Sequence, residues 1–401
     1  LAVNPSYLGG IDGMSAGAVF SATAISAGIA TLCMAFFANY PVALASGMGL
    51  NAFFAFTVCG AMGYSYKVAL TAVFIEGIIF MLLSLFKFRE ALVNKIPSNL
   101  KFAITAGIGL FIAIIALLNA NVVVASESTT VALGELSSPT VVLSLVGLLI
   151  IGALQHYKVP GGILLGILIT WVLGIIAQLV GWYVPNPEAG VYSVIPQFSL
   201  SSFEAPKMFQ FDFGFIAKNI PAFILIVFTF LYTDIFDTVG TLIGVAEKGK
   251  LLDKDGSLPN ATGALMADAV GTVVGACFGT STVTSYVESS AGVAAGGRTG
   301  LTAVTTAVLF FISLIFAPIF TSIPSFATTP AMLYVGLLML SSIRQVKFDG
   351  DIADAIGAFL AIIMMPLTYS IANGIMFGIV SWVILKLVTG KAKDISAVMW
   401  I

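Results

Sequence analysis

Long apolar runs separated by short polar segments dominate the hydrophobic pattern of this chain. Most runs approach about 20 residues, the length that an α-helix needs to cross the hydrocarbon core of a bilayer. We therefore expect an all-α polytopic membrane protein with about 14 transmembrane segments, the first of them represented by residues 1–7. The other predicted spans are 17–39, 41–60, 66–86, 101–119, 141–156, 161–182, 219–245, 261–279, 282–296, 301–321, 326–343, 353–369 and 371–389.

The composition indicates the same class. Hydrophobic residues make up 59% of the 401 residues and charged residues only 9%, whereas a soluble domain carries about 25% charged residues. Disordered, collagen-like and coiled-coil chains are excluded on the same grounds. The net charge of −2 gives no indication of nucleic-acid binding, and a single histidine, His156, excludes a multi-histidine metal site. Nothing in the sequence indicates a cofactor.

The basic residues predict how the chain lies in the membrane. If the run at 66–86 ends in the cytoplasm, then every lysine and arginine except Lys67, Lys207 and Lys218 falls on the cytoplasmic side. Such an asymmetry sets the orientation of membrane proteins. We expect a multi-pass protein of the plasma membrane, which is the inner membrane in a bacterium, surrounded by lipid. The longest connection, residues 183–218, is expected to be an external loop.

Two short motifs recur in the same order in the two halves of the chain. Residues 96–98 (IPS) precede Gly109, and residues 323–325 (IPS) precede Gly336 at the same spacing. The segments GILLGI and GIMFGI then follow, one after each copy. Copies separated by seven spans run in opposite directions, so the pattern predicts the inverted repeat of secondary transporters.

Acids inside apolar runs mark candidate functional positions, because charge inside a membrane is costly. Asp234 and Asp237 are three residues apart on one predicted helix, so we expect them on nearly the same face, with Thr241 one turn later. Two such close acids should not both be ionised in a low dielectric, so one is expected to carry a proton. The alternative is a structural pair bonded to the backbone or to a neighbouring helix. The other acids in apolar runs are Glu76, Asp268 and Glu288.

Two predicted spans have a composition that suits irregular backbone. Residues 279–292 (GTSTVTSYVESSAG) favour an extended strand followed by a half-helix that carries Glu288, and such backbone survives in a membrane only where it lines a cavity. The alternative is a packing seam of hydroxyl residues. Residues 41–54 (PVALASGMGLNAFF) show the same features in the first half. Asn51 can both donate and accept, which suits the edge of a heterocycle, and Phe53 either stacks on a planar ligand or packs.

Three of these segments carry a resemblance to a known family. Residues 47–54, 233–242 (TDIFDTVGTL) and 279–300 (GTSTVTSYVESSAGVAAGGRTG) resemble the purine-base permeases, the guanine/hypoxanthine/adenine branch of the nucleobase–cation symporters (azaguanine-resistance-like). The similarity extends along the whole chain. It implies 14 spans in two inverted repeats of seven, with the short strands in spans 3 and 10, and a core domain beside a gate domain.

The resemblance also divides the chain. The core domain would combine residues 1–86 with residues 219–321, and the gate domain would combine residues 87–182 with residues 322–401. The external loop at 183–218 would separate the two halves. A homodimer through the gate domain is left open by the sequence.

Site residues are carried over by motif match. Asn51, Asp234 and Glu288 would contact the purine, and Asp237 would be the coupling acid, although the roles of Asp234 and Asp237 could be exchanged. Tyr286 would line the pocket. The predicted substrate-binding set is Gly49, Asn51, Phe53, Asp234, Thr238, Thr241, Tyr286 and Glu288, and the predicted proton-coupling pair is Asp237 and Glu288.

The function expected from these observations is proton-coupled uptake of purine nucleobases by alternating access. Hypoxanthine and guanine are the expected substrates, and adenine is left open. The alternative is a symporter for uracil, xanthine or an inorganic anion. An intramembrane aspartyl protease would need Tyr-Asp and Gly-x-Gly-Asp motifs, which the sequence lacks, so we expect a transporter and not an enzyme. Saturable, proton-dependent flux would exclude a passive channel.

Overall fold

The structure, a computed structural model, is mostly helical. It describes residues 1, 3–85, 96–159, 161–186, 191, 193–195, 203–254 and 257–396. Eight helices in this part of the chain are long and apolar enough to cross a membrane by length and composition, and four apolar helices are shorter. The chain is therefore a multi-pass membrane protein, and the number of 14 spans stays a prediction.

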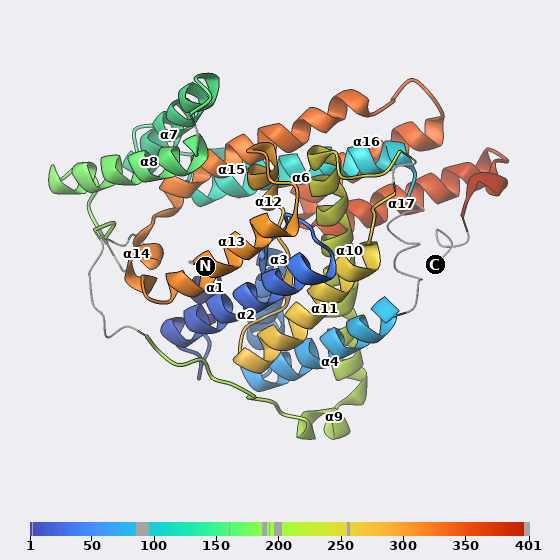
Figure 1. The fold of residues 1–401 in the computed structure, drawn as a ribbon, viewed down its shortest axis with the longest axis horizontal. Helices are drawn as coiled ribbons and strands as arrows, with labels where there is room; N and C mark the ends of the chain where they lie inside the picture. The colour runs from blue at the N-terminus through green and yellow to red at the C-terminus, as the bar shows by residue number, and fades with distance from the viewer. Residues whose placement is uncertain are drawn as a thin grey trace.

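One group of helices forms what we call the first bundle. Within it, α11 packs against both α2 and α4, α13 packs against α2, and α10 packs against α4. Figure 1 shows these helices in the lower part of the molecule. The helices of the first bundle are α1 (Val3–Leu8), α2 (Ala16–Phe37), α4 (Tyr66–Leu85), α10 (Ile220–Gly249), α11 (Ala261–Phe278) and α13 (Gly300–Ser313).

A second group, the second bundle, lies above the first in Figure 1. Here α6 packs against α15 and α16, α16 packs against α17, and α7 packs against α8 and α15. The helices of the second bundle are α6 (Ser98–Asn119), α7 (Pro139–His156), α8 (Gly162–Leu179), α15 (Ser325–Leu340) with the 3₁₀-helix Ser341–Gln345, α16 (Ile352–Thr368) and α17 (Ile371–Val388), after which a 3₁₀ turn covers Ala392–Asp394.

Two spans of the first bundle are broken, and each contains one of the predicted short strands. Strand β1 (Leu44–Ser46) pairs antiparallel with β4 (Val283–Ser285), with Ala45 opposite Thr284. The buried backbone keeps its hydrogen bonds, as a membrane interior requires. For example, Leu44 N donates to Thr31 Oγ1 at 2.9 Å. After β1 come α3 (Met48–Ala52) and a π-helix (Phe53–Ala61), and α12 (Ser289–Ala294) follows β4.

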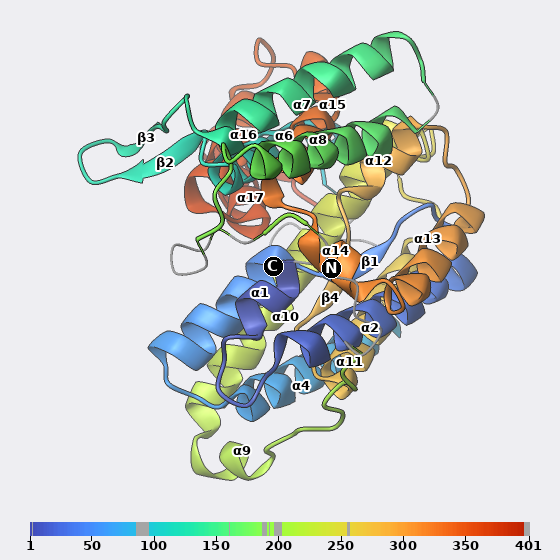
Figure 2. The same cartoon turned by 90° about the vertical axis from the view of Figure 1, so that its left-hand side faces the viewer.

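One detail of the sequence prediction is wrong. The span predicted at 301–321 is not one helix, because α13 ends at Ser313 and α14 (Ala317–Ser322) begins four residues later. Pro318 has no backbone N–H for a continuous helix and is accepted in the first turn of a new one. The connection between α6 and α7 contains a β-hairpin, β2 (Val123–Ser126) with β3 (Thr130–Leu133), which projects from the second bundle in Figure 2. Its β-branched residues favour strands.

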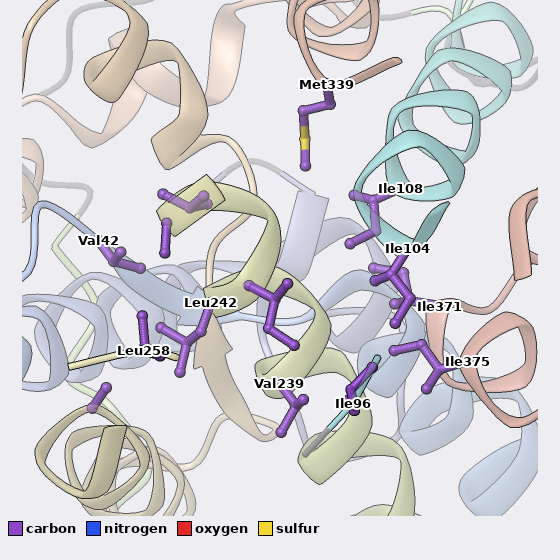
Figure 3. Packing of buried hydrophobic residues seen from close by; sticks show 14 of the residues in the cluster. Val42, Ile96, Ile104, Ile108, Val239, Leu242, Leu258, Met339, Ile371 and Ile375 are labelled. Carbon is purple, nitrogen blue, oxygen red and sulfur yellow. The ribbon is translucent and has the colours of Figure 1, made fainter. Parts of the chain in front are cut away.

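Helix α10 joins the two bundles. It packs against α4 on one side and against α6 and α17 on the other. Figure 3 shows its buried side chains beside those of α6 and α17, where Ile108 and Ile375 are labelled. A Cβ added at Gly240 would lie 3.0 Å from Ile375 Cδ1 and 3.2 Å from Ile371 Cγ2, so a larger residue here would require these side chains to shift slightly.

The described parts of the loop at 183–218 contact both bundles. Trp171 Nε1 on α8 donates to Val194 O at 2.8 Å, which fastens one part to the second bundle. Asp212 N donates to Thr71 Oγ1 on α4 at 2.8 Å, which fastens the other part to the first bundle. The loop ends in α9 (Gly214–Lys218). The predicted domain boundary at residues 86 and 87 lies outside the described residues.

Candidate functional site

A cavity of about 260 Å³ lies between the two bundles. Its first-bundle wall comes from the start of the third span, from α10, and from the segment that links β4 to α12. Its second-bundle wall comes from α6 and from the corner between α16 and α17. The size is slightly below the range of about 300–1,000 Å³ usual for drug-sized ligands, which suits a small flat solute.

Helix α10 presents one polar face to this cavity. Thr233, Asp237 and Thr241 are spaced four residues apart, so they lie above one another on the helix, and all three line the cavity. Asp234 does not line it. Asp234 is buried, and its Oδ2 accepts a hydrogen bond of 3.3 Å from Thr272 Oγ1 on α11.

Asp234 and Asp237 lie on nearly the same face of α10, as expected, but only Asp237 lines the cavity. A separation of three residues corresponds to about 300° around a helix of 3.6 residues per turn, which leaves the two side chains about 60° apart. The boundary between the side of α10 that faces the cavity and the side that packs against α11 lies between these two side chains. The sequence spacing alone could not show which of the two acids would face the cavity.

Behind the cavity wall, Asp268 on α11 connects α10 with β4. Its Oδ2 accepts from Thr238 Oγ1 at 2.8 Å, and its Oδ1 accepts from Ser285 N at 2.7 Å and from Ser285 Oγ at 2.8 Å. The hydroxyls of Thr238 and Thr284 are 2.8 Å apart. Thr238 is thus a buried part of this network and does not line the cavity. The network fixes β4 against the helix that carries Asp237.

Glu288 and Tyr286 line the cavity from the segment after β4. The strand ends at Ser285, and the chain then turns, with Ser289 N donating to Tyr286 O at 3.1 Å. The side chain of Glu288 is partly buried. The irregular backbone predicted here does border a cavity, and it brings a carboxyl group into a part of the membrane protein where charge is rare.

The third span contributes fewer cavity residues than its motif predicts. Gly49 and Phe53 line the cavity, and the Phe53 ring also contacts Phe230 edge-on, with centroids 4.8 Å apart. Asn51 is buried away from the cavity, and its Oδ1 accepts a hydrogen bond from Ser281 Oγ. Its Nδ2 has no acceptor among the described residues. Asn51, like Asp234 and Thr238, therefore lies one layer behind the wall.

Sequence reasoning missed the second-bundle wall. It is formed by Phe111 on α6 and by Tyr369, Ser370, Ile371 and Asn373. Tyr369 has φ +55, so the chain makes a tight corner between α16 and α17, and its ring meets Phe111 edge-on at 5.7 Å. The available signal was a polar residue, Asn373, inside the predicted span 371–389.

The chemistry of the cavity is that of a polar, partly aromatic binding site. Two of its lining residues, Asp237 and Glu288, carry carboxyl groups, and Phe53 and Phe111 carry aromatic rings. No group of His, Cys, Asp and Glu that could hold a metal ion occurs within the described residues. The arrangement can accept hydrogen bonds from a neutral solute with N–H groups and can cover its flat face.

Comparisons with known proteins give a consistent result. The permease family matches residues 2–377. The chain is 44% identical over 402 residues to the guanine/hypoxanthine permease PbuO of Bacillus subtilis (strain 168), covering 98% of this chain and 89% of that protein. It is 41% identical over 394 residues to the adenine permease AdeQ of Escherichia coli (strain K12), covering 98% and 85%. These names agree with the expectation of a transporter and not an enzyme.

A solved structure is similar in fold. The transmembrane domain of a cyanobacterium bicarbonate transporter, BicA, matches with a TM-score of 0.58 and 18% sequence identity, covering 93% of this chain and 94% of that chain. At this identity the match describes the fold alone.

Proposed function

This chain belongs to the permease family that matches residues 2–377, and on that premise we propose that it carries purine nucleobases across the membrane, coupled to protons. The observation that carries the proposal is the cavity between the bundles, which combines the carboxyl groups of Asp237 and Glu288 with the ring of Phe53. The names of the relatives PbuO and AdeQ support purines as the substrate class.

In the proposed binding mode the purine lies in this cavity. The carboxyl group of Glu288 accepts its N–H donors, Phe53 covers its face, and Gly49, Thr241 and Tyr286 complete the first-bundle wall. Asn51, Asp234 and Thr238 support this wall from behind. Each buried polar group that a wrong solute leaves unpaired costs about 1–3 kcal/mol, so a few such bonds would separate purines from pyrimidines.

Proton coupling would use Asp237 together with Glu288. Both carboxyl groups line the cavity, and moving a bare charge through a low dielectric is costly. Protonation of one carboxyl neutralises it and lowers the barrier to moving the loaded site. The membrane potential contributes about 2.3 kcal/mol per elementary charge per 100 mV.

Alternating access would be a movement of the first bundle, as the core, against the second bundle, as the gate. The interface along α10 is apolar and includes Gly240. Such a surface has few polar groups to break and remake when one bundle slides along the other, which supports this mechanism.

The proposed mechanism includes two inverted repeats of seven spans. The glycines of the repeated motif support it, because a Cβ added at Gly109 would lie 2.6 Å from Gly336 O, and one added at Gly336 would lie 2.7 Å from Gly109 O. Equivalent positions contact each other where a two-fold axis passes between the copies. The antiparallel pairing of β1 with β4 fits the same axis.

A carboxyl-lined cavity disfavours the alternative of an inorganic anion, because an ionised carboxylate repels an anion. Uracil and xanthine are the competing solutes that the same wall could accept. Both are therefore used as competitors in the uptake experiment described next.

The experiment is uptake of labelled hypoxanthine into proteoliposomes under an imposed inward proton gradient, with unlabelled guanine, adenine, uracil and xanthine as competitors. We expect uptake that follows the gradient and is inhibited by purines more strongly than by uracil. Uptake that is independent of external pH would contradict proton coupling. Inhibition by uracil or xanthine alone would reassign the substrate.

A further inference from the structure

The second bundle supplies polar groups to the cavity that the binding mode above does not use. Tyr369, Ser370 and Asn373 line it from the corner between α16 and α17. A solute held by Asp237 and Glu288 on the first bundle shares the cavity with this second wall. The polar atoms of the wall therefore contribute to what the cavity can bind.

Two of the three polar residues are already engaged in holding the corner together. Ser370 caps α17, because its Oγ accepts a hydrogen bond of 3.2 Å from the backbone N–H of Asn373. The ring of Tyr369 packs against Phe111. The side-chain amide of Asn373 forms no hydrogen bond with any described residue, and only its backbone contributes to the cap. Asn373 also carries the single side-chain amide among the described residues that line the cavity.

We infer that Asn373 is a specificity-determining residue whose side-chain amide binds the edge of the purine, an inference that rests on the proposed function. An amide offers one acceptor and two donors. The carboxyl groups of the opposite bundle are acceptors when ionised, so they serve the N–H groups of a purine, and its oxygen or ring nitrogens need a donor from another residue of the cavity. The amide of Asn373 provides such a donor from the second-bundle wall, opposite the carboxyl groups.

The amide also explains how one cavity accepts more than one purine. A 6-oxopurine presents an acceptor oxygen where adenine presents an amino donor. A primary amide pairs with either edge after a half-turn about its terminal bond, because its oxygen and nitrogen then exchange places. An aspartate at the same position only accepts, so it would keep the bond to an amino group and lose the bond to an oxo group.

The test compares wild type, Asn373→Ala and Asn373→Asp, with Asn119→Ala as the matched control. Asn119 is exposed at the end of α6 and does not line the cavity. Uptake of labelled hypoxanthine into proteoliposomes is measured, and unlabelled adenine is the competitor. The cap of α17 uses the backbone of Asn373, so both variants retain it.

We expect Asn373→Ala to raise KM for hypoxanthine about threefold to tenfold, the effect of one hydrogen bond, with the maximal rate maintained. Asn373→Asp should raise the potency of adenine relative to hypoxanthine by about tenfold, and Asn119→Ala should match wild type. Unchanged KM and selectivity in both variants, or a loss confined to maximal rate, would overturn the inference while wild-type purine uptake still supports the transport function. A wild type that takes up no purine would overturn the proposed function and this inference with it.

Discussion

Carboxyl groups within the bundles are tolerated at the residue scale because neighbouring side chains and backbone groups bind them. Asp268 accepts hydrogen bonds from Thr238 Oγ1 and from both polar atoms of Ser285. Glu288 instead borders the cavity. The same carboxyl group therefore has two roles. Asp268 is structural, within the hydrogen-bond network, and Glu288 at the cavity wall has the proposed binding role.

Glu288→Gln removes the charge and keeps the size of the side chain. We expect hypoxanthine uptake to fall roughly 10- to 100-fold, because a hydrogen bond to a charged group contributes about 1.5–3 kcal/mol. Uptake into proteoliposomes measures the effect. Glu135→Gln is the matched control, since Glu135 lies in the connection between α6 and α7, where its Oε1 accepts a hydrogen bond of 2.8 Å from Ser137 Oγ. Wild-type uptake by Glu288→Gln would contradict the binding role.

Asp268→Asn leaves one acceptor oxygen where two now accept three hydrogen bonds. We expect the free energy of unfolding to fall by about 1–3 kcal/mol, since a buried donor loses its acceptor. Thermal unfolding in detergent measures this change. Asp349→Asn, at an exposed position in the loop before α16, is the control and should unfold as wild type does. Equal stability of the two variants would show that the network does not hold β4.

At the element scale, close approaches between helices depend on glycine. Helices α6 and α15 meet at Gly109 and Gly336, and each glycine lies against the backbone carbonyl of the other. A further contact holds α16 to α17, because Asp351 accepts hydrogen bonds from Lys386 Nζ at 2.6 Å and from Lys391 Nζ at 2.8 Å. Backbone contact and ion pairing thus fix the second bundle at different points.

Gly109→Ala would place a methyl group 2.6 Å from Gly336 O and Leu340 N, both of them backbone atoms. Such overpacking costs typically about 1–3 kcal/mol, so we expect a lower unfolding midpoint in detergent. Gly152→Ala on α7 is the control, because no atom lies within 4 Å of its added Cβ. Alanine also favours a helix by about 1 kcal/mol over glycine. A Gly109→Ala protein as stable as Gly152→Ala would refute the close approach.

The ion pairs of Asp351 predict a pH dependence. The hydrogen bonds from Lys386 and Lys391 hold the pKa of the Asp351 carboxyl well below its ordinary value, which is about 3.9 in an unfolded chain. The folded state therefore binds the proton less well, so the contribution to stability is complete above about pH 5 and is lost as the pH falls through the lowered pKa. The melting temperature of wild type minus that of Asp351→Asn should be constant near neutral pH and should shrink below about pH 4. A difference that grows on acidification would contradict this assignment.

At the scale of the whole molecule, the two bundles have an apolar interface with polar contacts near one end of α10. Glu247 Oε2 on α10 accepts from Ser342 Oγ at 2.6 Å, and Lys248 Nζ donates to Leu338 O at 2.6 Å. The loop at 183–218 is fastened to both bundles elsewhere. Movement of one bundle against the other would have to break the polar contacts of α10.

Cysteines at Glu247 and Ser342, joined by a short bis-methanethiosulfonate reagent that forms a disulfide with each and releases sulfinate, should lock the bundles together. The native Cys33, Cys59 and Cys277 are replaced first. We expect crosslinking to abolish purine uptake and cleavage of a reducible linker to restore it. The control pair, Val124 and Ala132, lies across the hairpin β2–β3 within one bundle, so its crosslinking should leave uptake intact. Full uptake by the crosslinked Glu247–Ser342 pair would contradict a relative movement at this point.

The sequence by itself determined the membrane class, the approximate positions of the long helices and the two broken spans with their strands, because hydrophobic run length and turn-forming residues act locally. It also singled out Glu288 and Asp237 as acids in apolar runs. Only the tertiary structure decided that Asp237 and not Asp234 borders the cavity, because that depends on the rotation of α10 against its neighbours. The wall with Asn373 likewise arises from packing between segments far apart in the chain, which no local pattern encodes.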